Sequence, residues 1–267
     1  MVGGVFYEHG HRLIAGFVAL LTVFQLFVIL RFEERSWVKK LAVLGVALVL
    51  TQATLGGLTV LFLLPKAISI AHACLAQTYF CNAVILMAVT SESWETSFPC
   101  ESDKSQFSIR ALSLLVVFGF FIQLLFGATM RHFGAGLAIP DFPLSFGRWV
   151  PAEWTFPIAI HFAHRLGAFV MVGLVAALVA RVYRLYWNQF AVLIYAGVLM
   201  GFVWVQVMLG AMVIWLRRPV SLTTIHLVVG ALCLASAVRL ALQLFKAQRV
   251  ASGKVIFGNL ESELLPV

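Results

Sequence analysis

The sequence predicts an all-α polytopic membrane protein whose seven transmembrane helices form two tandem pseudo-repeats of a four-helix bundle, the first repeat lacking its first helix. Three observations lead to this class. Hydrophobic residues make up 62% of the 267 residues and charged residues 11%, whereas charged residues are about a quarter of ordinary soluble domains. The apolar residues form runs of about 20, the length that crosses a bilayer core. Finally, a set of polar motifs recurs in the same order in both halves.

Seven apolar runs are long enough to cross a membrane. They are continuous rather than alternating, as in 41–50, which argues against the strands of a transmembrane barrel. Because lipid offers no hydrogen-bond partner to the backbone, each run must be an α-helix. The predicted spans are residues 13–31, 41–62, 70–90, 109–130, 161–181, 190–215 and 222–245.

The connections between the spans predict the orientation of the chain. Lysine and arginine are concentrated at 31–40, at 181–189 and after 239, and alternating spans place these segments on one side. By the positive-inside rule that side is the cytoplasm. The net charge of +8 therefore bears on membrane orientation rather than on nucleic-acid binding, and the N-terminus is predicted to lie outside.

A set of polar motifs occurs twice, and the second copy begins 153 positions after the first. In the first copy His11-Arg12 is followed after 41 residues by Gln52, which precedes Leu-Gly-Gly, and after 20 more by His72. The second copy has intervals of 42 and 20 residues and consists of His164-Arg165, Gln206 before Leu209-Gly210, and His226. Because one down-and-up passage of the chain separates the two histidines of a copy, we expect two histidine pairs near the outer membrane surface.

Histidine pairs on different helices of an apolar bundle are typical axial ligands of haem iron. The arginine after the first histidine of each pair is suited to binding haem propionates. A single histidine near a helix end is more often an ordinary interfacial residue, but four in register favour ligands. Zinc is a weaker alternative, because Glu8 is the one further ligand candidate beside the first pair. Three histidines outside the repeat are interpreted as interfacial or supporting groups: His9, His132 and His161.

The two pairs differ in the residue three positions before the first histidine, which is Glu8 in one copy and His161 in the other. A carboxylate beside a metal centre can accept or relay protons, although an acid at a helix start is also favoured by the helix dipole alone. The difference predicts a reactive site in the first repeat and a cofactor-holding site in the second. The cysteines are interpreted as small apolar fillers without a disulfide framework: Cys74, Cys81, Cys100 and Cys233.

These features predict four parts of the chain. They are an N-terminal half-bundle at 1–90, a cytoplasmic linker at 91–108, a C-terminal four-helix bundle at 109–245 and a cytoplasmic tail at 246–267. Between the fourth and fifth spans, residues 131–160 are rich in glycine, proline and aromatic residues. Such a segment suits a compact cap at the membrane interface.

Taken together, the motifs resemble the haem A synthases of bacterial membranes and mitochondria over essentially the whole chain. The resemblance rests on seven features in order: Glu8-x-x-His11-Arg12, Gln52 with Leu55-Gly56-Gly57, His72, Gly134-x-Gly136-Leu137-x-x-Pro140-Asp141-x-Pro143, His164-Arg165, Gln206 with Leu209-Gly210, and His226. It implies an oxidoreductase that converts a ring methyl group of haem O to the formyl group of haem A for terminal oxidases.

The resemblance also implies residue roles and partners. Seven residues are implicated: His164 and His226 as ligands of a resident haem b with Arg165 beside them, His11 and His72 as ligands of the substrate haem O with Arg12 beside them, and Glu8 in the oxidation. The implied partners are haem O, haem O synthase, terminal oxidase assembly factors and a membrane electron acceptor. The implied location is a bacterial inner membrane, with the haem sites near its outer face.

One feature separates this chain from the family pattern. Family members usually have eight spans, with a segment like 134–143 after the first, so we expect a truncated reading frame or a misassigned start.

Two other functions remain open. The alternative function is a bis-histidine dihaem b cytochrome that passes electrons and has no need of Glu8. A transporter or structural membrane protein that uses the histidines for packing would bind no haem.

Overall fold

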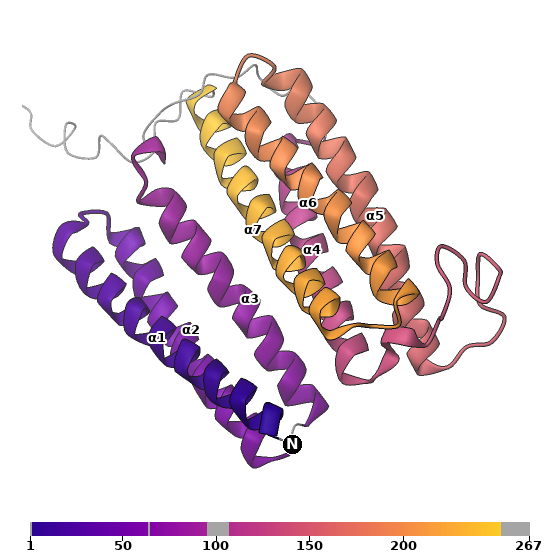
Figure 1. The fold of residues 1–267 in the computed structure, drawn as a ribbon. Helices are drawn as coiled ribbons and strands as arrows, with labels where there is room; N and C mark the ends of the chain where they lie inside the picture. Colours follow the sequence, from indigo (N-terminus) through magenta and orange to yellow (C-terminus); the bar gives the residue numbers. More distant parts are fainter. Residues whose placement is uncertain (1, 64, 95–106, 252–267) are drawn as a thin grey trace, which may run out of the picture. The chain divides into compact units, whose positions relative to one another are not determined.

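The computed structural model describes residues 2–63, 65–94 and 107–251. These residues form seven long α-helices and two short 3-10 turns (Figure 1). All seven helices are long and apolar enough to cross a membrane, so the predicted all-α, multi-pass membrane protein is confirmed. Their bounds are α1 (Val2–Phe32), α2 (Ser36–Leu61), α3 (Lys66–Val89), α4 (Ile109–His132), α5 (Phe156–Leu185), α6 (Phe190–Trp215) and α7 (Val220–Ala251).

Several helices extend beyond the apolar runs that predict them. The helix α1 begins at Val2, so Glu8 and His11 lie within it rather than before it. The helix α5 begins at Phe156, with Pro157 in the first turn, where proline's missing N–H removes no helical hydrogen bond. The helix α4 begins where predicted, because the Ser108 hydroxyl accepts a hydrogen bond from the Ala111 N–H at 3.2 Å.

The chain divides into two compact units, residues 1–90 and 91–267, here called the N-terminal unit and the C-terminal unit. Most of the predicted linker, including Cys100, and most of the predicted tail lie outside the described residues. The other three cysteines are free thiols on helices α3 and α7.

In the N-terminal unit, α2 packs against both α1 and α3. The hydroxyls of Thr22 and Tyr79 are 2.5 Å apart and join α1 to α3. The Asn82 amide donates to the Leu41 carbonyl at 3.2 Å and joins α3 to α2. Such interhelical hydrogen bonds suit a bilayer, where apolar side chains gain little by leaving lipid for protein.

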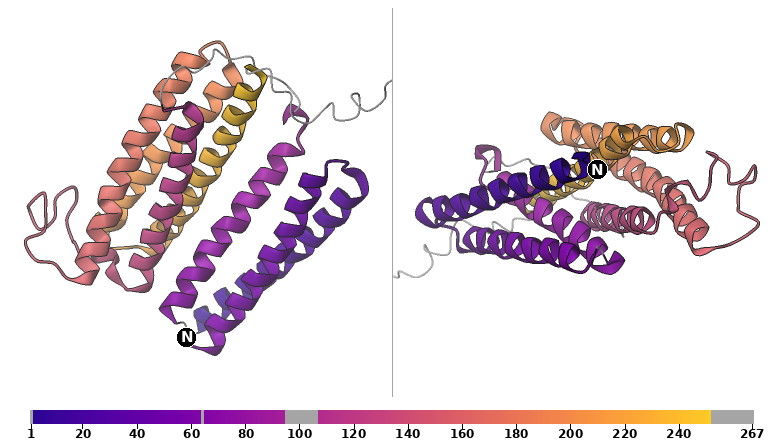
Figure 2. Two further views of the ribbon diagram at one scale, coloured as in Figure 1. Left: turned by 180° about the vertical axis from the view of Figure 1, so that it is seen from behind. Right: turned by 60° about the horizontal axis from the view of Figure 1, so that its bottom comes forward.

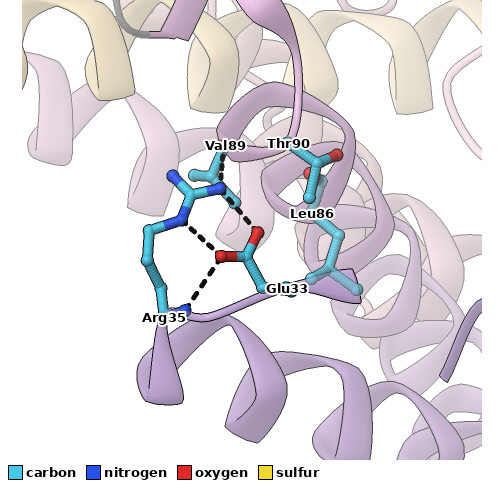
Figure 3. A network of polar contacts seen from close by, with 5 residues as sticks. All are labelled: Glu33, Arg35, Leu86, Val89 and Thr90. Carbon is cyan, nitrogen blue, oxygen red and sulfur yellow. Dashed lines mark hydrogen bonds and ion pairs between the residues drawn. The ribbon is translucent and has the colours of Figure 1, made fainter. Parts of the chain in front are cut away.

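An arginine and a glutamate close the turn between α1 and α2 against the end of α3 (Figure 3). The Arg35 side chain donates to both carboxylate oxygens of Glu33, at 2.8 and 2.7 Å, and to the Val89 carbonyl at 3.0 Å. The Arg35 backbone N–H also donates to Glu33, at 2.9 Å. The hydrogen bonds from the Arg35 side chain lower the pKa of Glu33 from 4.5 to about 2. Arg35 therefore satisfies a carbonyl at the C-terminal end of α3.

We expect Glu33→Gln to lower the free energy of unfolding of the N-terminal unit by about 2 kcal/mol, because charged hydrogen bonds are lost. Since the folded-state pKa lies below 4.5, the pair stabilises the fold fully above pH 4.5 and loses this effect as the pH falls toward 2. Thermal unfolding in detergent at a series of pH values measures this. The two proteins should differ most above pH 4.5 and converge in acid, whereas Glu34→Gln, at an exposed neighbour, should match wild type. Identical profiles for Glu33→Gln and wild type would contradict the assignment.

The four helices of the C-terminal unit form a closed ring in which α4 packs on α5, α5 on α6, α6 on α7 and α7 on α4 (Figure 2). Buried residues three and four apart line the inside of each helix, as in Val175, Leu178 and Val182 on α5. Helices α5 and α7 therefore occupy one diagonal of the ring, and α4 and α6 occupy the other. Side chains on a diagonal pair can meet in the centre of the bundle.

The segment between α4 and α5 is an irregular loop beside the start of α5, as the views in Figures 1 and 2 agree. Its first turn begins at Gly134, which has a φ of +68°, a value that favours glycine. The Asp141 carboxylate accepts from the N–H groups of Phe146 and Gly147 at 2.7 and 2.8 Å. Burial acts to raise the pKa of Asp141, but these hydrogen bonds outweigh it and the pKa is lowered. Asp141 thus stabilises the tip of the loop.

Candidate haem-binding site

The two histidines predicted as ligands in the C-terminal unit face each other across the bundle. His164 lies on α5 and His226 on α7, the helices of one diagonal. Their ring centroids are 6.5 Å apart, and the ring planes meet at 72°. Both residues are half-buried, and Nδ1 of His226 is a buried atom without a hydrogen-bond partner.

This separation fits two imidazoles that bind one iron from opposite sides. With metal–nitrogen bonds of about 2 Å and roughly 1 Å from ring nitrogen to ring centre, two axial rings have centroids about 6 Å apart. The ring centroids of His164 and His226 are separated by 6.5 Å. Two imidazoles from opposing helices are also a chemically appropriate donor set for haem iron. The residues present therefore fit the implied group.

Two glutamines on the other diagonal lie against these histidines. The Gln123 amide on α4 donates to the His164 carbonyl at 2.7 Å and lies 3.2 Å from His164 Nδ1. The Gln206 amide on α6 lies 3.4 Å from His226 Nε2. Gln206 belongs to the predicted repeat, but sequence analysis missed Gln123. The signal was available, because Gln123 is followed four residues later by Gly127, just as Gln206 is by Gly210.

His161 and Arg165 hold the loop between α4 and α5 against the start of α5. His161 is 2% exposed, and its Nδ1 accepts from the Ile139 N–H at 3.2 Å. The Arg165 guanidinium donates to the carbonyls of Leu144 and Ile139, both at 2.9 Å. These contacts give His161 a supporting role that the sequence left open. They also give Arg165 a role in loop anchoring that the sequence analysis did not anticipate.

We expect Arg165→Lys to loosen this loop, because one ammonium group cannot match the two-armed guanidinium contact. Losing charged hydrogen bonds of this kind costs about 2 kcal/mol, so tryptic cleavage after the exposed Arg148 should accelerate by about tenfold or more. The matched control is Arg184→Lys, at an exposed position near the other end of α5. Equal cleavage rates in Arg165→Lys and wild type would show that Arg165 does not anchor the loop.

The N-terminal unit holds the other predicted pair in a more open setting. His11 on α1 is exposed, whereas His72 on α3 is half-buried, and the two side chains are close enough to interact electrostatically. The Gln52 amide on α2 donates to the His72 carbonyl at 3.0 Å and lies 3.3 Å from His72 Nε2. Nδ1 of His72 is buried without a partner. The two histidines therefore come together within one unit, as the repeat predicts for their sequence positions.

Glu8 and Arg12 form an ion pair one turn apart on α1. The Arg12 guanidinium lies 2.5 Å from the Glu8 carboxylate, and the two side chains are 56% and 48% exposed. Because about half of the Glu8 side chain is exposed, this carboxylate remains accessible to other groups. Glu8 precedes His11 by less than one turn of the same helix, so it lies near the histidine pair.

No group of three or more histidine, cysteine, aspartate or glutamate residues that could hold a metal ion occurs among the residues that the structure describes. A structural zinc site needs about four such ligands, so zinc has no support in the described part of the chain. Iron held between two axial histidines needs no third protein ligand.

A family model described as cytochrome oxidase assembly protein, COX15-CtaA, matches residues 3–238. The chain belongs to this family. The match includes all four histidines of the repeat, Glu8, and the loop between α4 and α5, so the predicted resemblance to this family is confirmed.

Known members similar to this COX15-CtaA chain carry the name "Heme A synthase". That of Halalkalibacterium halodurans is 27% identical over 175 residues, which cover 64% of this chain and 57% of the relative. That of Symbiobacterium thermophilum is 28% identical over 186 residues, 68% of this chain and 58% of the relative. That of Bacillus cereus strain AH187 is 26% identical over 232 residues, 82% and 70% respectively. This chain spans less than two thirds of the length of the first two relatives.

Proposed function

We propose that this chain acts as a haem A synthase, oxidising a ring methyl group of haem O to a formyl group. The observation that carries the proposal is the pair formed by His164 and His226, whose ring centroids are 6.5 Å apart in the centre of the bundle. Membership of the COX15-CtaA family and the name shared by its relatives support the same function. The product would serve terminal oxidases.

In this proposal the two units have different tasks. His164 and His226 would hold a resident haem b, a one-electron carrier, and His11 and His72 would hold haem O. The half-buried setting of His164 and His226 suits a permanent cofactor. The exposed His11 suits a ligand that must admit and release a substrate. Arg165 and Arg12 would supply positive charge for propionates.

Glu8 would accept protons at the site formed by His11 and His72. Oxidation of a methyl group to a formyl group, with water supplying the oxygen atom, releases protons and electrons. The Glu8 carboxylate, less than one turn from His11 and 2.5 Å from the Arg12 guanidinium, would accept protons there. The electrons would pass to an acceptor in the membrane, and haem O synthase and oxidase assembly factors are the expected partners.

The proposal is tested by expressing the full chain in cells that make haem O but no haem A. Haems extracted from the membranes are then analysed by mass spectrometry. A haem A synthase yields haem A, in amounts that depend on expression of the chain. If the purified chain carries haem but the membrane extracts contain haem B and haem O without haem A, the result would instead support the dihaem b cytochrome.

A further inference from the structure

Three helical hairpins of this protein share one arrangement around a histidine. In each, the first helix carries a glutamine and, four residues later, a glycine, and the second helix carries the histidine. We call each glutamine–glycine pair a cradle. The three cradles are Gln52 and Gly56 of α2 with His72 of α3, Gln123 and Gly127 of α4 with His164 of α5, and Gln206 and Gly210 of α6 with His226 of α7.

The glycine of each cradle lets the imidazole lie against the helix backbone. A Cβ atom placed on Gly56, Gly127 or Gly210 would lie 3.2 Å from Cε1 of the corresponding histidine. That distance is tighter than ordinary packing, so a larger residue would force the ring to shift by a few tenths of an ångström. By contrast, a Cβ atom on Gly57 or Gly201 would meet no atom within 4 Å. Gly45 of α2 and Gly119 of α4 also lie close to side chains of a neighbouring helix, but among the glycines of the described residues a histidine ring lies against the three cradle glycines.

The glutamine of each cradle places its amide nitrogen beside the histidine ring, and its amide oxygen has no hydrogen-bond partner. Its amide nitrogen lies 3.3 and 3.4 Å from Nε2 of His72 and His226, and 3.2 Å from Nδ1 of His164. Its Oε1 atom is buried and has no hydrogen-bond partner in any of the three. A buried acceptor without a partner costs about 1–3 kcal/mol, and three repetitions of it indicate a common purpose.

The chemistry of an iron-bound imidazole supplies that purpose. As long as the amide N–H donates to one ring nitrogen, the imidazole's proton stays on the other nitrogen. When that other nitrogen binds iron, the proton must move to the nitrogen that faces the glutamine, which then needs an acceptor. A glutamine can meet both needs, because turning the amide group exchanges its nitrogen and its oxygen. Leucine or lysine could not. In Gln52 and Gln123 the turn also gives up the hydrogen bond from the amide to the histidine carbonyl, whereas the Gln206 amide lies against the ring of His226 alone.

We propose that Gln52, Gln123 and Gln206 are positioning residues that accept the N–H of an iron-bound histidine through Oε1, and so set its orientation and the reduction potential of the iron. This inference rests on the proposed function, since it requires haem at these histidines. An acceptor on the ring N–H makes the imidazole a stronger donor and stabilises ferric iron. The cradle glutamines would thus tune the electron transfer that the oxidation requires.

The test uses the purified full chain with haem b bound and compares Gln206→Leu and Gln206→Glu with wild type by redox titration. Gln206→Leu removes the acceptor and should raise the midpoint potential, whereas Gln206→Glu is a stronger acceptor and should lower it. Affinity for haem should fall by about tenfold or more in Gln206→Leu. Gln189→Leu, at the opposite end of α6, should change neither. Shifts in the same direction for both Gln206 variants, or no shift, would overturn the inference while the proposed function stands.

A glycine pair on the same helix tests the other half of the cradle. Gly210→Ala should reduce the haem b content of the purified protein, because the added methyl group displaces the His226 ring. Gly201→Ala should retain full content, since that position is open. Equal haem content in both variants would overturn the cradle. Wild-type protein that binds no haem at all would instead refute the proposed function.

Discussion

Replacing His226 with alanine is expected to abolish the bis-histidine haem spectrum of the C-terminal unit. The ring of His226 faces that of His164 at 6.5 Å, and an alanine leaves one side of the iron without a protein ligand. We expect loss of most bound haem b, or a change from low-spin to high-spin absorbance in the haem that remains. His164→Ala should have the same effect, because the two rings would hold one iron between them.

Absorbance spectra of the purified variants, with haem content normalised to protein, measure this effect. His132→Ala is the matched control, since His132 lies at the end of α4 and outside the pair. Added imidazole should restore part of the low-spin spectrum in His226→Ala, which separates a missing ligand from a misfolded bundle. Unchanged haem content and spin state in both His164→Ala and His226→Ala would contradict the assignment.

Replacing Glu8 with glutamine is expected to lower the rate of haem O conversion by about 100-fold or more, the usual effect of removing a general base. Glutamine keeps the size of the side chain but cannot accept a proton, and the ion pair with Arg12 is lost. The haem b content and spectrum of the C-terminal unit should remain unchanged. A dihaem cytochrome that only transfers electrons would be unaffected.

The conversion rate is measured by mass analysis of haems after a fixed growth period, with protein level as the reference. Glu8→Asp, which retains the charge at a shorter reach, should show an intermediate rate. Glu153→Gln, at an exposed acid of the loop between α4 and α5, should match wild type. A Glu8→Gln rate within twofold of wild type would remove Glu8 from the reaction.

The sequence predicts most of the fold because lipid imposes a simple rule on it. Each continuous apolar run must become a helix, and all seven were placed. The ends were less accurate, since polar residues at a membrane interface can continue a helix, as Glu8 and His11 do in α1. The turn held by Glu33 and Arg35 could not be predicted, because the carbonyl that Arg35 binds belongs to Val89, 54 residues away.

The candidate site was predicted in part. The histidines were found because their intervals recur, with Gln52 and Gln206 each 20 residues before a histidine. Gln123 was missed because the loop between α4 and α5 lengthens its interval to His164 to 41 residues. In addition, phenylalanine replaces the leucine before Gly127. The contacts of His161 and Arg165 depend on the path of that loop, which no periodic pattern encodes.

The central claim is that His164 and His226 bind one iron between them. Low-temperature electron paramagnetic resonance of the oxidised full chain, purified with its haem, tests it most directly. We predict a low-spin ferric signal typical of two axial imidazoles, which is lost in His226→Ala and retained in His132→Ala. A high-spin signal from the wild-type protein, or a bis-imidazole signal that persists in both His164→Ala and His226→Ala, would contradict the claim.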